Sequence, residues 1–224
     1  EINKACDIVW NIVQKADKIE DQDQDKDKDK IKDNSKPKYN PFLHMWYGTR
    51  DIPDRQNAWV FGIGSALTLG ALTLDTEVKN YFSDKNRLSP WDKFGNNVLG
   101  TGIPGVAIGL SSLLYGLASN KQLHIDAGLS HLEALLASAV YTSILKYSIQ
   151  RPRPNSSNKL SFPSGHTSTA FTSAASLMDS YGPYAGVPAL ALSVYTGVGR
   201  LSANVHHLSD VIFGGVLGLV VGHG

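Results

Sequence analysis

Three clusters of polar residues in the C-terminal third of the sequence have the types and the spacing that chemistry on an anion requires. The first is a lysine separated by six residues from an Arg-Pro pair, and the second is a Pro-Ser-Gly-His run. The third is an arginine, a histidine after five intervening residues, and an aspartate after three more. Their candidate site residues are Lys146, Arg153, Ser164, Gly165, His166, Arg200, His206 and Asp210.

Together these groups suit phosphoryl transfer. Arginine forks and a lysine ammonium match the charged oxygens of a phosphate, and a helix that starts near Ser164 would add unpaired N–H groups. A neutral imidazole can attack phosphorus when an acceptor holds its other nitrogen, and Asp210 lies one helical turn after His206. His166 can protonate the leaving oxygen. We expect a phosphohistidine mechanism with no metal ion and no cofactor, because the sequence shows no paired-carboxylate site.

Each cluster taken alone also has a purely structural interpretation. Ser164 is a good helix N-cap, Lys146 can compensate a helix C-terminus, and a histidine and an aspartate four residues apart can be an ordinary helical pair. Two neighbours compete for roles, since Arg151 also precedes a proline and His207 directly follows His206. The lysine spacing favours Arg153, and the step to Asp210 favours His206.

The order and spacing of the three clusters resemble the signature of the type 2 phosphatidic acid phosphatase superfamily. This superfamily includes lipid phosphate phosphatases, soluble bacterial acid phosphatases and vanadium-dependent haloperoxidases. The resemblance implies an all-α fold in which His206 is the nucleophile, Asp210 orients it and His166 is the general acid. Lys146, Arg153 and Arg200 would clamp phosphate, assisted by Ser164 and Gly165. Gly199 stands where the family commonly has serine.

Hydrophobic periodicity predicts an all-α bundle with helices near 58–74, 98–117, 126–149, 167–179, 187–200 and 207–221. We expect an exposed stretch from 75 to 87, followed by a helix start at the Ser-Pro-Trp run of 89–91. Residues 1–55 are predicted to form a separate N-terminal part, with a helix, a loop rich in Asp and Lys, and an aromatic segment. Residues 56–224 would form the catalytic domain.

The composition limits the partners. With 224 residues, 42% of them hydrophobic, and a formal net charge of +1, the chain is not expected to bind nucleic acid. Its single cysteine, Cys6, excludes an intrachain disulfide framework. The expected partner is a phosphorylated lipid or a small phosphate ester.

Location is the harder inference. The charge-free runs 98–118 and 180–199 reach spanning length, but the mean hydropathy of −0.15 favours a soluble helical core. We expect an extracytoplasmic protein, periplasmic or membrane-associated, whose signal peptide has been removed and whose aromatic segment makes a peripheral membrane contact.

Two other functions use the same pocket: a vanadium-dependent haloperoxidase, and a non-catalytic phosphate-binding bundle.

Overall fold

The computed structural model describes residues 55–83, 98 and 101–223 of the chain. The predicted N-terminal part, residues 1–55, and the helix start at 89–91 lie outside the described residues, apart from Arg55 itself. Within the described part every regular element is a helix, as the sequence predicted. The elements are α3 (Arg55–Ser83), α5 (Ile103–Ser119), α6 (Gln122–Ile149), α7 (Gly165–Tyr181), α8 (Pro183–Ser202) and α9 (Leu208–Gly222).

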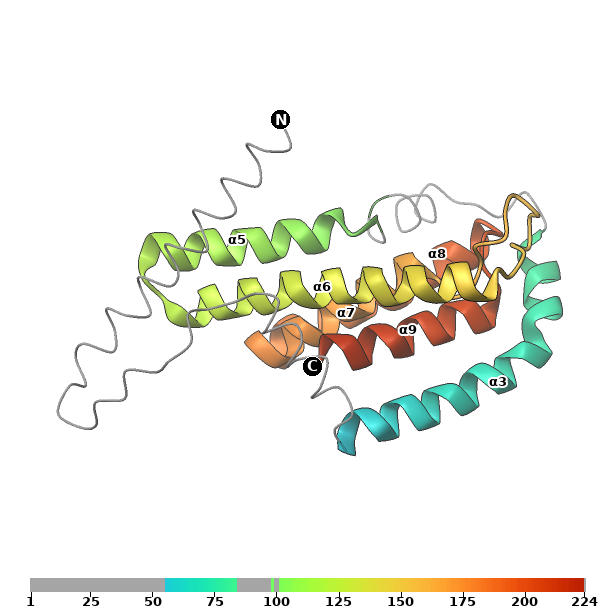
Figure 1. Cartoon of the computed structure of the whole chain (residues 1–224), viewed down its shortest axis with the longest axis horizontal. Coiled ribbons are helices and arrows are strands. Elements are labelled where there is room, and N and C mark those ends of the chain that lie inside the picture. Colours follow the sequence, from blue (N-terminus) through green and yellow to red (C-terminus); the bar gives the residue numbers. More distant parts are fainter. Residues whose placement is uncertain (1–54, 84–97, 99–100, 224) are drawn as a thin grey trace.

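The helices run up and down, so that their ends collect at two ends of the bundle (Figure 1). Helix α7 packs against α8 and α9, α6 packs against α5 and α7, and α3 lies along α9. One end of the bundle therefore collects the segments that carry the site (Figure 1). They are the ends of α3, α6 and α8, the starts of α7 and α9, and the 150–164 loop.

Small residues allow α7 and α9 to approach closely. A Cβ atom added to Gly218 would lie 2.4 Å from the carbonyl oxygen of Ser168, and one added to Gly222 would lie 2.6 Å from that of Thr172. The same helix face begins with Gly214, whose Cβ would lie 2.6 Å from the carbonyl oxygen of Ser164. The glycine stripe on α9 thus sets the distance between two helices that carry candidate site residues.

Part of the interior of the bundle is polar, beside an apolar cluster of Leu113, Leu117 and Ile125. Between α6 and α7, the hydroxyls of Ser138 and Ser168 lie 2.6 Å apart, and Thr142 donates to Ser168 at 3.3 Å. Thr167, Thr172 and Ser209 are also fully buried. Buried hydroxyls are stable only when they are hydrogen-bonded, so these contacts hold the helices in register.

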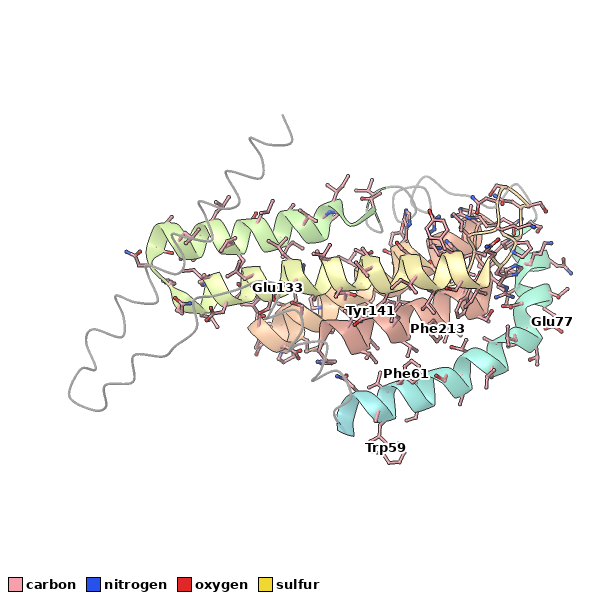
Figure 2. The ribbon with its side chains drawn as sticks, in the orientation of Figure 1. Trp59, Phe61, Glu77, Glu133, Tyr141 and Phe213 are labelled. Carbon is pink, nitrogen blue, oxygen red and sulfur yellow. The ribbon has the colours of Figure 1, made fainter. Side chains whose placement is uncertain are left out.

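The outer surface is apolar instead. Trp59 and Leu69 on α3 are each 66% exposed, and Tyr147 on α6 is 67% exposed. Figure 2 shows Trp59 pointing away from the bundle, whereas Phe61 points toward Phe213 of α9, with ring centroids 6.3 Å apart. Two helical segments, Asn57–Ser83 and Gln122–Ile149, are long and apolar enough to cross a membrane, and only 22% and 28% of their apolar stretches are buried. The mean hydropathy led us to expect a soluble helical core, whereas this outer surface carries many exposed apolar side chains.

One predicted element differs in a way that matters for the site. The sequence suggested a helix that ends near 74 and an exposed stretch from 75 onward. Helix α3 instead continues to Ser83, and Asp75 is only 6% exposed. The prediction failed because the charged residues after 74 were taken to mark a solvated loop, although one of them faces the bundle.

Candidate active site

The predicted site residues converge at the end of the bundle where α6, α7, α8 and α9 meet. Lys146 lies in the last turn of α6 and Arg200 in the last turn of α8, while Gly165 and His166 open α7. His206 lies in the connection between α8 and α9, and Asp210 lies in the first turn of α9. His166 experiences the charges of Arg200, Arg153 and Lys146 as well as that of His206. The three clusters are therefore brought together as their spacing suggested.

The geometry of His206 sets its tautomer. Its Nδ1 lies 2.7 Å from the carbonyl oxygen of Ser161, and the side chain is nearly fully buried. A carbonyl only accepts hydrogen bonds, so Nδ1 carries the proton and Nε2 keeps its lone pair. Burial lowers the pKa of His206 to about 4; Asp210 opposes this effect, and the charges of Arg200 and Lys146 add to it. The imidazole is thus neutral near pH 7, the form that a nucleophile requires.

Asp210 reaches His206 largely through Ser161. The Asp210 carboxylate oxygen lies 3.8 Å from Nδ1 of His206, beyond hydrogen-bond distance, but it accepts a hydrogen bond from the hydroxyl of Ser161. It also accepts one from the backbone N–H of His207 at 2.8 Å. Ser161 therefore links the two residues, with its hydroxyl on Asp210 and its carbonyl on His206.

The two rival arginines have different surroundings. Arg151 bonds through Nη2 to Asp75 at 2.7 Å and through Nη1 to Asp210 and to the hydroxyl of Ser209. Burial would lower the pKa of Arg151, but these two carboxylates raise it. Arg153, by contrast, has a buried Nε that meets no partner among the described residues, and burial lowers its pKa. Arg153 can accordingly receive an anion, whereas the Arg151 guanidinium is already held.

Lys146 has a structural contact as well as a charge. Its Nζ donates to the carbonyl oxygens of Leu160 and Pro163 at 2.7 and 2.6 Å, so it ties the end of α6 to the loop that precedes Ser164. An ammonium has three donors, which leaves one for a ligand.

Ser164 and Gly165 form the start of α7. Ser164 stands at the N-cap, yet its hydroxyl lies 2.9 Å from that of Thr167, and no side-chain capping bond is found within the described part of the chain. The first N–H groups of a helix have no intrahelical partner and attract anions. A Cβ on Gly165 would lie 3.2 Å from Thr142, so the close packing there favours glycine.

The rival histidine, His207, serves as the N-cap of α9. Its Nε2 lies 3.3 Å from the carbonyl oxygen of Pro152, and its ring is more exposed than that of His206. This position at the edge of the cluster agrees with the choice of His206 as the nucleophile.

Three residues of the site were missed by sequence reasoning: Asp75, Ser161 and Ser209. Ser161 and Ser209 are fully buried at the centre of the network, but a serine in a Ser-rich loop or in the first turn of a helix carries no distinctive signal. For Asp75 a signal was available, since a carboxylate in a long apolar helix usually has a partner.

Comparison with known proteins identifies sequences and structures that this chain resembles. The sequence model of the PAP2 superfamily matches residues 127–224. We call this matched segment the PAP2 region. All eight predicted site residues lie inside this PAP2 region, whereas α3, α5 and Asp75 precede it.

Among curated proteins, a lipid A 1-phosphatase of Porphyromonas gingivalis is 40% identical over 80 residues. That alignment covers 34% of this chain and 18% of the relative's length. The crystal structure of Aquifex aeolicus LpxE has a TM-score of 0.49 at 22% identity, covering 66% of this chain and 92% of that one. A PAP2-type phosphatidylglycerolphosphate phosphatase of Bacillus subtilis has a TM-score of 0.45 at 21% identity, covering 81% and 90%.

Proposed function

We propose that this chain is a phosphatase that hydrolyses phosphate monoesters or pyrophosphates through a phosphohistidine at Nε2 of His206. The observation that carries the proposal is the hydrogen bond from His206 Nδ1 to Ser161, which leaves Nε2 as a nucleophile beside Arg153, Arg200 and Lys146. The PAP2 match over residues 127–224 supports the same reaction class.

The reaction has two steps. In the first, Nε2 of His206 forms a bond to phosphorus while the bond from phosphorus to the leaving oxygen breaks. Burial and the charges of Arg200, His206, Arg153 and Lys146 lower the pKa of His166 to about 3. The negative charge of bound phosphate offsets these cations, so that His166 holds a proton and gives it to the leaving oxygen. Arg153, Arg200 and Lys146 stabilise the charge that spreads over the equatorial oxygens. In the second step, water attacks phosphorus, neutral His166 takes its proton, and inorganic phosphate leaves His206.

We further propose that the substrate is a lipid phosphate and that the described helices are embedded in a membrane. Two apolar segments of spanning length, of which only 22% and 28% are buried, support this, as do the exposed aromatic and aliphatic side chains on α3 and α6. The lipid A 1-phosphatase relative supports a lipid substrate in the same way. The extracytoplasmic location stays a prediction.

The decisive experiment measures phosphate release by the purified chain in detergent, with EDTA present. An aryl phosphate tests the chemistry, and mixed micelles that contain phosphatidic acid, phosphatidylglycerol phosphate, a polyprenyl pyrophosphate or lipid A test the substrate class. Release from a lipid supports the proposal. Halide oxidation on addition of vanadate and peroxide, with no phosphate release, would favour the haloperoxidase, and phosphate binding without either reaction would favour the non-catalytic bundle.

Membrane insertion is tested separately by fractionation of cells that express the chain. We expect it to remain with membranes after washing with carbonate and with high salt. Extraction by these washes would contradict insertion while leaving the phosphatase proposal standing.

A further inference from the structure

Asp75 is an acidic residue buried in an otherwise apolar helix. It lies on α3 and is 6% exposed, while Glu77, two residues later, is exposed and points away from the bundle (Figure 2). A buried carboxylate is costly unless charges and hydrogen bonds compensate it. The contacts of Asp75 therefore indicate what the residue does.

Within the described part of the chain, the hydrogen bonds of the Asp75 carboxylate lead to the catalytic end of the PAP2 region. Its Oδ1 accepts the backbone N–H of Ser209 at 2.9 Å, and its Oδ2 accepts the Ser209 hydroxyl and Nη2 of Arg151, each at 2.7 Å. Ser209 lies in the first turn of α9, directly before Asp210. Asp75 thus holds both the start of α9 and the 150–164 loop.

The guanidinium of Arg151 extends this link to the catalytic groups. Its Nη2 binds Asp75 while its Nη1 binds Asp210, so one cation bridges two buried carboxylates. Asp210 accepts the Ser161 hydroxyl, and the Ser161 carbonyl holds Nδ1 of His206. A continuous chain of hydrogen bonds joins Asp75 to the nucleophile through Arg151, Asp210 and Ser161.

The bridge has an electrostatic consequence. Two carboxylates and one guanidinium carry a net negative charge next to His206, whose ring becomes positively charged when Nε2 binds phosphorus. The packing of α3 against α9 does not by itself require this charged bridge, because apolar contacts such as that of Phe61 with Phe213 already join the two helices.

We propose that Asp75 is a positioning residue for His206, acting through Arg151 and the first turn of α9. The proposal rests on the phosphatase function proposed above. It implies that the active site is incomplete within residues 127–224 and that α3 is part of the catalytic unit.

The test compares Asp75→Asn with Glu77→Gln, a matched loss of one charge from the exposed side of the same helix. Both variants are assayed in the full chain in detergent, with the aryl phosphate as substrate. We expect Asp75→Asn to lower kcat about tenfold to a hundredfold. A loss of this size is typical when the outer hydrogen-bond partner of a metal-binding histidine is removed. KM and inhibition by inorganic phosphate should stay near wild type, because Arg153, Arg200 and Lys146 are retained. Asp75→Glu should restore part of the rate, and Glu77→Gln should match wild type.

A double-variant cycle tests the route through Arg151. If Asp75 acts through this guanidinium, adding Asp75→Asn to Arg151→Met should cause little further loss of kcat. Losses that multiply would contradict this route.

Two control measurements test whether each variant folds. They are thermal unfolding and the amount of phosphoenzyme that forms in a single turnover. A merely structural role would lower the number of active sites, whereas a positioning role slows phosphoenzyme formation at an unchanged final amount. If Asp75→Asn does not fold, Ser209→Ala removes one donor to Asp75 and should still lower kcat. A wild-type rate in Asp75→Asn would overturn the inference. If only Ser209→Ala folds, a wild-type rate in that variant would overturn it. An inactive wild-type protein would instead overturn the proposed function.

Discussion

The carbonyl oxygen of Ser161 lies 2.7 Å from Nδ1 of His206. This contact fixes the ring and its tautomer, a role that the sequence alone had assigned to Asp210. Because the Ser161 hydroxyl donates to Asp210, the serine transmits the effect of the carboxylate instead of replacing it. The following predictions depend on this arrangement.

Ser161→Ala should keep the carbonyl contact and remove the hydroxyl contact. One hydrogen bond to a charged group is lost, so we expect kcat to fall by about fivefold, or about 1 kcal/mol, with KM unchanged. Steady-state kinetics with the aryl phosphate measures this. Ser143→Ala is the control, because the Ser143 residue is exposed and its hydroxyl donates to the carbonyl oxygen of Ala139 in its own helix. Equal rates in the two variants would show that Asp210 acts without Ser161.

His206→Ala should abolish turnover and remove the phosphoenzyme, because no other nitrogen replaces Nε2. The phosphoenzyme is recovered after alkaline quenching, since the phosphorus–nitrogen bond of phosphohistidine survives base better than acid. His207→Ala should retain phosphoenzyme formation, because His207 caps α9 at the edge of the site. The reverse pattern would assign the nucleophile to His207.

The acid side of the pH profile should reflect the lowered pKa of His206, which is about 4. Below this pKa the ring is protonated and cannot attack phosphorus, so kcat/KM should fall as the pH drops through about 4. A histidine with its ordinary pKa would lose activity near pH 6.5 instead. The profile is measured with a correction for ionisation of the substrate phosphate. If the corrected kcat/KM already falls near pH 6.5, the imidazole of His206 is not held neutral by burial.

Arg153→Ala and Arg151→Met should fail in different ways. Arg153 is available to phosphate, so its loss should cost about 2–4 kcal/mol in kcat/KM and weaken inhibition by inorganic phosphate. Arg151 joins Asp75 to Asp210, so its loss should lower kcat and the thermal unfolding temperature while phosphate inhibition changes little. Phosphate inhibition constants and thermal unfolding distinguish the two, and weakened inhibition in the Arg151 variant would reverse the assignment.

How far the sequence predicts this protein depends on whether a feature is local. The spacing from Arg200 to His206 to Asp210 lies within one helix–turn–helix, and the helices near 126–149 and 207–221 were predicted within a few residues. The partners of Asp75 lie on α9 and in the 150–164 loop, which are remote in sequence, so the local sequence could indicate that Asp75 has a partner but could not identify it. Mean hydropathy does not report this arrangement for a related reason, because it averages over a bundle with many buried hydroxyls and many exposed apolar side chains.

The last prediction concerns the α7–α9 contact that sets the site's geometry. A methyl group on Gly214 would lie 2.6 Å from the carbonyl oxygen of Ser164, a backbone atom that cannot move without shifting the start of α7. We expect Gly214→Ala to destabilise the protein by about 1–3 kcal/mol and to lower kcat as well, because Ser164 directly precedes Gly165 and His166. Gly70→Ala on α3 is the matched control, since no described atom lies within 4 Å of the added methyl. That change should be neutral or slightly stabilising, because alanine favours a helix over glycine. Thermal unfolding in detergent and aryl phosphate kinetics test both variants, and wild-type behaviour of Gly214→Ala would mean that α7 and α9 are less closely packed than this structure shows.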